Sequence, residues 1–318
     1  MRYVAGREPQ LLAWLREAVF SSTGFRIRAA QGQAAGSGLA GWAEHAAASL
    51  FFTFFPADCR VCGSPLIRIS RLPVCESCLD ALRPRAGSYC SICGEALLSP
   101  ALVKRGDATC GLCQLTHPPF EKLVAYGSYD GGLRDLIHLL KYQQVRPAAA
   151  VLGRMLMEAI AGLEGEFPAA GVSVVPVPLH EKKQRQRGFN QSELIARAAL
   201  KNLARPDRFR LLPAALARTR ETASEIGLTR HQRRENLRGA FKVVDAHAVI
   251  DREILLVDDV FTTGTTASEC SRLLRRAGAK KVSVVTVART LKVSSIFVAR
   301  EQDLGEAKEG RLAAAANG

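Results

Sequence analysis

The sequence predicts an α/β fold with a mostly parallel sheet and helices on both of its faces, preceded by a small cysteine-rich module. Two observations carry this prediction. From about Phe120 onward, short apolar runs alternate with segments in which apolar residues recur every three or four positions. Before that point, eight of the nine cysteines form four closely spaced pairs. Strands that alternate with helices are typical of a parallel sheet with helices packed against it.

The elements of the larger part follow in order along the chain. Apolar spacing predicts a helix over 131–144 and another over 148–163, and a short β-branched run at 171–179 predicts a strand that ends in prolines. Ligands of such sheets bind beyond the carboxyl ends of the strands, so the loops after the strands are the places to search for a site. The remaining predictions are a helix over 191–204, a buried strand over 253–259, a helix over 266–278 and a strand over 280–288.

The cysteine pairs predict two zinc sites. Two residues between paired cysteines place both sulfurs on one side of a tight turn, and a second such pair completes a tetrahedral zinc shell. The competing interpretation, disulfide bonds, requires an oxidising compartment, and the chain shows no export signal. Two successive zinc ribbons are favoured, although an interleaved arrangement uses the same residues. Cys270 stands apart and is expected to be an ordinary buried side chain, and His117 is close enough to be a spare ligand. The predicted ligands are Cys59, Cys62, Cys75, Cys78, Cys90, Cys93, Cys110 and Cys113.

The composition bounds the partners and the location. A formal charge of +14 and a pI near 9.7 favour polyanions or phosphorylated substrates, although a generally basic solvated surface has the same charge. No apolar run is long enough to span a membrane, and the first 20 residues lack the apolar centre of a signal peptide, so we expect a cytoplasmic protein without membrane insertion. Residues 1–45 are rich in Ala, Gly and Gln and are expected to form a disordered or irregular extension.

The stretch "EILLVDDVFTTGTTASE" carries the candidate ligand site. Asp258 and Asp259 end an apolar strand, and a loop of threonines around one glycine then leads into a helix. Backbone N–H groups and hydroxyls of such a loop suit a phosphate, whereas carboxylates accept hydrogen bonds and suit the vicinal hydroxyls of a sugar. The stretch therefore predicts a ribose 5-phosphate cradle. The alternative is that the acid pair supplies a helix N-cap and a magnesium ligand, as in other phosphate-handling α/β folds. The candidate phosphate contacts are Thr262, Thr263, Gly264, Thr265 and Thr266.

These motifs resemble a known family. "ILLVDDVFTTGTT" is similar to the phosphoribosyl-pyrophosphate signature of type I phosphoribosyltransferases, without a gap. With "FFPADCRVCG", "VPVPLHEKKQRQRGFNQSELIARA" and "ARTRETASEIGLTRHQRRENLRGAF", it resembles the ComF family of competence-associated proteins, which place a zinc ribbon before a phosphoribosyltransferase domain. The resemblance implies an extension at 1–45, a double zinc ribbon at 49–117, a phosphoribosyltransferase-like domain at 120–290 and a variable tail at 291–318.

The resemblance also implies roles for individual residues. Pro176, Val177 and Pro178 would lead into the loop that holds pyrophosphate, which leaves with magnesium in that superfamily. Lys182 and Arg187 follow that loop and would neutralise the diphosphate, with Arg187 favoured because it begins the family-like "RGFNQ". The segment Arg218 to Arg238 resembles the loop that closes over the site, with Arg220 and Thr222 as its contacts. Glu225 departs from the family's glutamine and weakens the anion-binding role of that loop.

Two functional hypotheses follow from the resemblance. The first is a phosphoribosyltransferase linked to natural competence, whose acceptor the motifs do not identify. The second is an accessory of DNA uptake or processing that keeps the pocket for ligand binding without turnover and binds single-stranded DNA, with other competence or DNA-processing proteins as partners. Only 6% of residues are aromatic, so such DNA binding would depend mainly on phosphate contacts and would be strongly salt-dependent.

Overall fold

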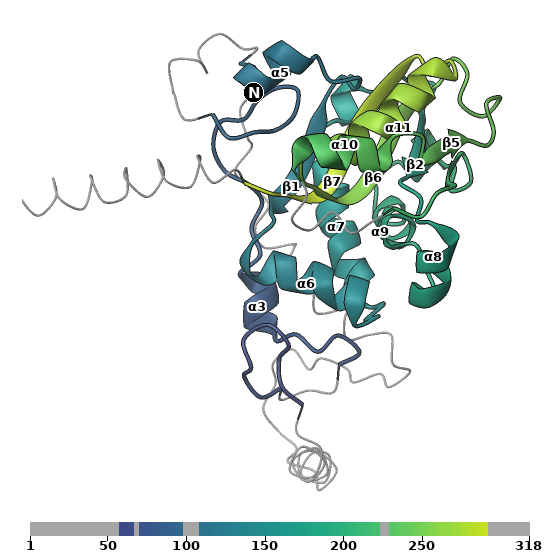
Figure 1. Cartoon of the computed structure of the whole chain (residues 1–318). Coiled ribbons are helices and arrows are strands. Elements are labelled where there is room, and N and C mark those ends of the chain that lie inside the picture. The colour runs from purple at the N-terminus through teal and green to yellow at the C-terminus, as the bar shows by residue number, and fades with distance from the viewer. Residues whose placement is uncertain (1–56, 67–69, 98–107, 223–228, 292–318) are drawn as a thin grey trace, which may run out of the picture.

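The computed structural model describes residues 57–66, 70–97, 108–222 and 229–291 (Figure 1). The predicted extension at 1–45 and the predicted tail, apart from its first residue, lie outside this range, as does Glu225. The domain boundaries inferred from the resemblance therefore stay predictions. Among the described residues, no helix is both long enough and apolar enough to cross a bilayer.

The larger part is built on a five-stranded sheet in the order β1-β7-β6-β2-β3, and all of its strand pairs are parallel. The predicted parallel sheet is thereby confirmed. A separate antiparallel pair, β4 with β5, lies beside it. The strands are β1 (Leu123–Ser128), β2 (Val172–Pro176), β3 (Phe209–Leu211), β4 (Leu216–Arg218), β5 (Phe241–Val243), β6 (Glu253–Phe261) and β7 (Lys281–Arg289).

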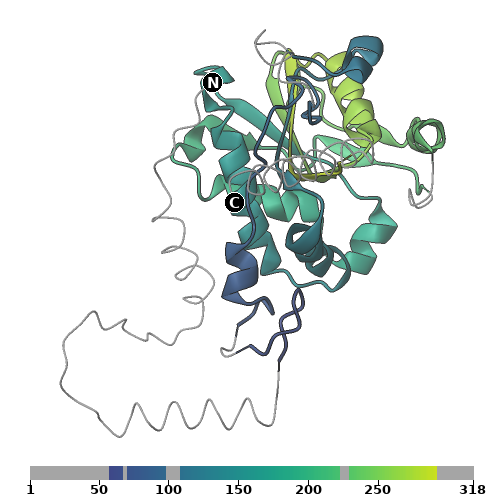
Figure 2. The ribbon, with the colours of Figure 1, turned by 90° about the vertical axis from the view of Figure 1, so that its left-hand side faces the viewer.

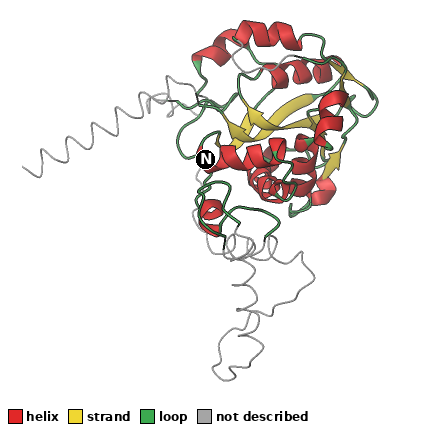
Figure 3. Cartoon of the chain, turned by 60° about the horizontal axis from the view of Figure 1, so that its bottom comes forward, coloured by secondary structure: helices red, strands yellow, loops and turns green. Residues whose placement is uncertain are grey.

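Helices cover both faces of the sheet, as Figure 3 shows with the yellow strands between red helices. Successive strand residues point to opposite faces, so β6 supplies Leu255 to one core and Leu256 to the other. The first core packs under α6, α7 and α9, and the second packs under α11. The helices of this part are α6 (Gly131–Tyr142), α7 (Ala148–Ala161), α8 (Glu181–Arg187), α9 (Gln191–Leu200), α10 (Arg230–Leu237) and α11 (Thr265–Arg276).

The central strands β2 and β6 end at the same edge of the sheet. They are paired in parallel, with Val175 opposite Leu256 and Pro176 opposite Val257. The segment after β2 enters α8 and α9, and the segment after β6 enters α11. Both predicted ligand loops are therefore neighbours in space, although about 80 residues separate them in the sequence.

The two cysteine clusters lie at different places around the larger part (Figures 1 and 2). The first, with α3 (Glu76–Asp80), packs beside α6, where Leu82 and Val61 lie close to Gly132. The second, with α5 (Gly111–Thr116), attaches next to β1 through a hydrogen bond from the Leu123 amide to the Ile92 carbonyl, 2.6 Å long. The module is thus two separately anchored units.

Candidate functional site

The eight paired cysteines form two zinc-binding sites of four cysteines each. Within each group the sulfur atoms all lie within 4.8 Å of one another, and the Sγ atoms of Cys62 and Cys75 are 3.6 Å apart, as are those of Cys93 and Cys110. Four thiolates on one tetrahedral zinc ion, at Zn–S distances of about 2.3 Å, would be separated by about 3.8 Å. The sulfur positions therefore fit zinc, and a site closed by four protein ligands stabilises the fold without leaving a position for chemistry.

The arrangement is successive, not interleaved. The first site takes Cys59, Cys62, Cys75 and Cys78, and the second takes Cys90, Cys93, Cys110 and Cys113. His117 belongs to neither group. Cys270 is fully buried on α11, where burial raises the pKa of its thiol, in agreement with its predicted structural role.

The acid pair lies at the carboxyl end of β6, and each carboxylate faces a different helix. Asp258 accepts a hydrogen bond from the Ser192 hydroxyl on α9, 3.0 Å long, and a second from the Asp259 amide, 2.9 Å long. Asp259 is 3% exposed and forms an ion pair with Lys141 on α6, with 2.7 Å between Nζ and Oδ2. The two carboxylates are thus held in fixed directions by two helices that pack on the same face of the sheet.

Burial and neighbouring charges shift the pKa values of Asp258 and Lys141 in this cluster. Burial and the neighbouring charge of Asp259 raise the pKa of Asp258 to about 7, although Lys141 and the Ser192 hydroxyl oppose the change. Burial alone would lower the pKa of Lys141, but the attraction of Asp259 and its hydrogen bond outweigh burial and raise that pKa. Lys141 is consequently a fixed cation next to an acid pair of which one member titrates near neutral pH.

Asn190 connects the two ligand loops. Its side-chain oxygen accepts a hydrogen bond from the Ser192 amide and caps α9, and its side-chain nitrogen donates to the Val177 carbonyl over 3.0 Å. The first turn of the same helix then presents Ser192 to Asp258. The "FNQS" sequence therefore fixes the end of β2 relative to the acid pair.

The Thr–Gly loop begins α11. Gly264 caps the helix with φ +78°, and a Cβ atom at this position would lie 2.5 Å from the Phe261 ring. Thr263 and Thr265 share a hydrogen bond between their hydroxyls, 2.9 Å long, and Thr262 lies 3.5 Å from an Arg233 nitrogen. Thr265 and Thr266 occupy the first turn of the helix, where unpaired backbone N–H groups suit an anion. The candidate phosphate contacts are thus adjacent in one turn, and the geometry of that turn requires glycine at position 264.

The cations predicted for the diphosphate have partners within the chain. Lys182 is exposed and forms an ion pair with Glu221 over 3.3 Å. Arg187 donates to the Gln191 side chain, and its guanidinium lies 5.9 Å from the centroid of the Tyr142 ring. Arg220 donates to the carbonyl oxygens of Asn236 and Arg238 at the end of α10, over 2.8 and 2.9 Å.

The other predicted contacts are distributed between surface and core. Pro176, Val177 and Pro178 are buried, so they position the following loop through the backbone. Thr222 is buried and accepts a hydrogen bond from Arg218. Arg187 therefore lies beside α6, which carries Lys141. Arg220 instead joins the segment that precedes α10 to the end of that helix. The roles of these residues toward a ligand stay predictions.

Two family models match the chain. A double zinc ribbon domain matches residues 50–114, and a phosphoribosyl transferase domain matches residues 215–295. The DNA utilization protein YhgH of Salmonella typhimurium (strain LT2) is 33% identical over 237 residues, which cover 74% of this chain and 98% of that protein. Competence protein F of Haemophilus influenzae is 32% identical over 244 residues, which cover 75% of this chain and 98% of that protein. The chain belongs to the ComF family.

A more distant member of the ComF family spans much of the same region. Competence protein ComFC of Bacillus subtilis is 24% identical over 231 residues, which cover 68% of this chain and 84% of that protein. The double zinc ribbon and the phosphoribosyltransferase fold that the resemblance implied are therefore both confirmed.

Sequence reasoning missed three residues of this ComF site. Lys141 and Ser192 contact the acids directly, and Asn190 fixes the loop between them. Lys141 had a usable indication, because it is a lysine near the carboxyl end of the apolar helix 131–144. Ser192 and Asn190 lay inside the quoted "RGFNQSE" motif. What the sequence does not contain is the approach of α6 and α9 to the end of β6, which depends on their packing on one face of the sheet.

Proposed function

We propose that the site binds phosphoribosyl pyrophosphate or a closely related sugar phosphate, with the ribose hydroxyls on Asp258 and Asp259 and the 5-phosphate on the loop Thr262 to Thr266. The observation that carries the proposal is the acid pair at the end of β6, held by Ser192 and Lys141, directly before the loop that begins α11. Carboxylates accept hydrogen bonds from hydroxyls, and the loop offers hydroxyl and backbone donors to a phosphate. One sugar phosphate satisfies both halves of the site.

The reaction that fits this ligand is transfer of the phosphoribosyl group with release of pyrophosphate. Magnesium bound to the diphosphate would neutralise its charge, and Lys182, Arg187 and Arg220 are our candidates for contacting the leaving group. Arg187 has the best support because it lies next to Tyr142, the neighbour of Lys141. For Lys182 and Arg220, contact with a ligand requires exchange of their present partners.

Calorimetric titration with phosphoribosyl pyrophosphate and magnesium tests this proposal. We expect binding to the wild-type protein and a loss of at least about tenfold in affinity for the Asp258→Asn/Asp259→Asn double variant. Asp207→Asn, an exposed acid outside the site, is the matched control and should bind normally. Absence of binding to the wild-type protein, or equal binding to the acid double variant, rejects the sugar phosphate site.

We further propose a role in DNA uptake or utilisation, acting in the cytoplasm, where cysteines remain reduced and available for zinc. The names of the relatives, DNA utilization protein and competence protein, support this role. A transformation assay in a competent host would compare the wild type with the acid double variant and with Cys90→Ser. Failure of the acid variant alone would show that the ligand pocket is required, whereas normal transformation by both variants contradicts the role.

A second candidate function is binding of single-stranded DNA without turnover. The exposed side chains of Lys182, Lys183 and Arg185 on α8, together with the net charge of +14, favour it. Phosphate contacts release counterions, so the logarithm of the affinity should fall linearly with the logarithm of the salt concentration. Affinity for a single-stranded oligonucleotide that does not change with salt would reject this electrostatic binding.

A further inference from the structure

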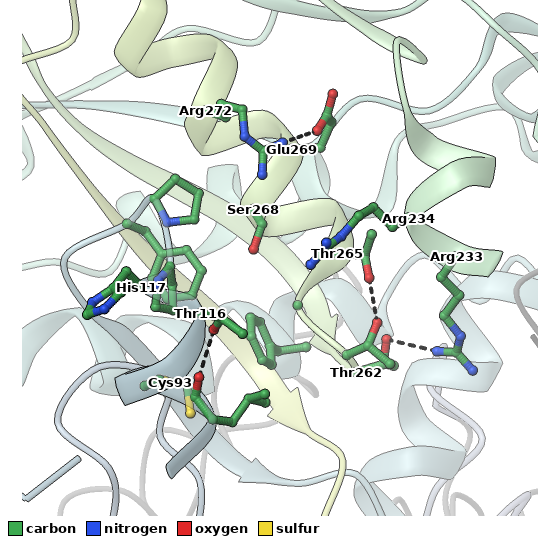
Figure 4. A pocket seen from close by; sticks show the side chains of 18 of the residues that line it. Cys93, Thr116, His117, Arg233, Arg234, Thr262, Thr265, Ser268, Glu269 and Arg272 are labelled. Carbon is green, nitrogen blue, oxygen red and sulfur yellow. Dashed lines mark hydrogen bonds and ion pairs between the residues drawn. The ribbon is translucent and has the colours of Figure 1, made fainter. Parts of the chain in front are cut away.

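A cavity separates the second zinc ribbon from the helices of the larger part. Its volume is about 510 Å³, which lies within the range of small-ligand sites. Most of its lining comes from three segments, which are α5 with the residues that follow it, the Thr–Gly loop with α11, and α10; Cys93, Arg289 and Thr290 complete it. Figure 4 shows side chains from all three segments converging on this space.

One wall of the cavity is polar and basic. Thr265, Ser268 and Arg272 lie at spacings of three and four on one side of α11, and Arg234 reaches toward them from α10 (Figure 4). Glu269 forms an ion pair with Arg272. Of the three charged side chains Arg234, Glu269 and Arg272, two are cations, so together they carry a net positive charge. Guanidinium groups next to hydroxyls match the several acceptor oxygens of a phosphate.

The opposite wall is apolar. Pro118 and Phe120 follow α5 and face the cavity together with Leu112 and Phe261. The rings of Phe120 and Phe261 are arranged edge to face with centroids 6.2 Å apart, which gives this wall a fixed shape. Aromatic and proline side chains of this kind pack well against a planar ring, so the cavity has complementary places for a ring and for a phosphate.

The cavity is separate from the acid pair. Asp258 and Asp259 face α9 and α6, and neither lines the cavity. The loop Thr262 to Thr265 is the shared wall, with the acid pair at the strand end that precedes it and the second ribbon across the cavity. A ligand that contacts α10, the part of α11 beyond Thr265 and the residues after α5 leaves this loop to the sugar phosphate, so both ligands can be present together.

We propose that this cavity is a second ligand site, which takes a nucleotide. Its phosphate lies between Arg234 and Arg272 with the hydroxyl of Ser268, so that Thr265 stays with the sugar phosphate, and its base lies against Pro118 and Phe120. The proposal goes beyond the proposed function, because it concerns a different cavity and needs no reaction. The same chemistry is present in a free mononucleotide and in the nucleotide at the 5′ end of a strand.

Calorimetric titration with adenosine monophosphate tests the proposal, and inorganic phosphate and adenosine are the comparison ligands. We expect the nucleotide to bind more tightly than either comparison ligand. The Arg234→Gln variant and the Arg234→Gln/Arg272→Gln double variant should lose at least about tenfold in affinity for this site. Arg276→Gln, an exposed arginine of the same helix, should bind as the wild type does. Arg234 is exposed, so its single variant is expected to fold even if loss of Arg272 disturbs Glu269.

The acid double variant separates the two proposals. A mononucleotide can also enter a phosphoribosyl site, so we expect two binding events in the wild type, of which Asp258→Asn/Asp259→Asn removes one and the arginine double variant removes the other. If the acid variant leaves no nucleotide binding at all, or the arginine variants bind as the wild type does, the second site is rejected. Failure of phosphoribosyl pyrophosphate to bind would leave this result unaffected.

The source of the nucleotide is distinguished by competition. A short single-stranded oligonucleotide with a 5′-phosphate should displace adenosine monophosphate from the acid double variant if the site takes a strand end, and the same oligonucleotide without the phosphate should not. Displacement by neither oligonucleotide assigns the site to free nucleotides. Equal binding of inorganic phosphate and adenosine monophosphate contradicts the proposal, because the apolar wall would then contribute nothing.

Discussion

Arg289, the last residue of β7, donates a hydrogen bond from Nε to the carbonyl oxygen of Cys93, a ligand of the second zinc site, over 2.8 Å. The same guanidinium forms an ion pair with Glu95 over 2.9 Å, and both side chains are at most 6% exposed. It also lies 5.3 Å from the centroid of the Phe261 ring, against which the Thr–Gly loop packs. One buried arginine therefore contacts the second ribbon, the sheet and the support of the phosphate loop.

Breaking this ion pair should destabilise the protein strongly. Glu95→Gln leaves the buried Arg289 charge without its carboxylate partner, so we expect a loss of about 3–5 kcal/mol, seen as a lower thermal midpoint. The Glu95→Leu/Arg289→Met double variant should lose less than Glu95→Gln, since it leaves no unpaired charge. Glu121→Gln, at an exposed position, is the control. A midpoint unchanged by Glu95→Gln would show that the ion pair does not attach the ribbon.

Lys141 should be important both for stability and for the ligand site. Lys141→Met leaves two adjacent carboxylates without their cation, and the expected loss is about 3–5 kcal/mol, with weaker sugar phosphate binding. Adding Asp259→Asn should restore part of the stability, and the resulting double-mutant cycle should give a coupling of about 1–3 kcal/mol. Lys122→Met removes the exposed ion pair with Glu166 and should cost less than about 1 kcal/mol. Additive effects of the Lys141 and Asp259 changes would contradict a direct pair.

Sugar binding should strengthen as the pH rises through about 7, the pKa to which burial and Asp259 raise Asp258. The ionised carboxylate accepts hydrogen bonds from both ribose hydroxyls, whereas the protonated acid has lost part of this capacity. The phosphate ligand also gains charge near pH 6, so Asp258→Asn is the control that retains only this contribution. Calorimetry over this pH range should show a steeper rise in affinity for the wild type than for the variant.

The raised pKa of Asp258 should also make the free energy of unfolding fall as the pH rises. The pKa of Asp258 is about 7 in the folded chain and 3.8 ordinarily, so between these values the folded state binds more protons than the unfolded state. The contribution of Asp258 to the free energy of unfolding therefore decreases across this window. Asp258→Asn should raise the thermal midpoint above about pH 7 and have little effect near pH 4. A variant less stable than the wild type at the higher pH would contradict the raised pKa.

Gly264→Ala should damage the phosphate loop more than an equally strained substitution elsewhere. Its Cβ atom would lie 2.5 Å from the Phe261 ring at a φ of +78°. Gly239→Ala is a matched control, because its φ is +66° and nothing lies within 4 Å of the added atom. Both variants should lose about 1 kcal/mol from backbone strain, but only Gly264→Ala should also lose affinity for the sugar phosphate. Equal affinities of the two variants would show that the loop does not hold the phosphate.

The purified protein should contain two zinc ions per chain. Metal analysis of Cys62→Ser and of Cys93→Ser should give one ion each, because each variant removes a ligand from a different site. A chelator should release both ions and lower the thermal midpoint, since four-cysteine sites contribute to folding. Thiols that fail to react after the metal is removed would instead favour disulfides.

The fold class, the zinc ligands and the acid–loop stretch could all be predicted from the order of residues along the chain. These features are local: the C-x-x-C spacing brings two sulfurs to one metal, and hydrophobic spacing distinguishes the helix over 148–163 from the strand over 253–259. Even here the cysteine spacing left the pairing open, and the structure shows two successive sites. The helix predicted over 266–278 spans Thr265–Arg276, so it begins inside the threonine loop.

The side chains that surround the acids, and the contacts that join the two parts of the molecule, depend instead on how distant elements pack. Lys141 and Ser192 come from elements far from the acids in sequence, and they reach Asp259 and Asp258 because α6 and α9 pack on the same face of the sheet at the end of β6. Arg289 and Glu95 are separated by 194 residues, so no local pattern indicates their pairing. Spacing along the chain predicts contacts within a turn or a helix, whereas the close packing of distant elements determines which charges are buried together.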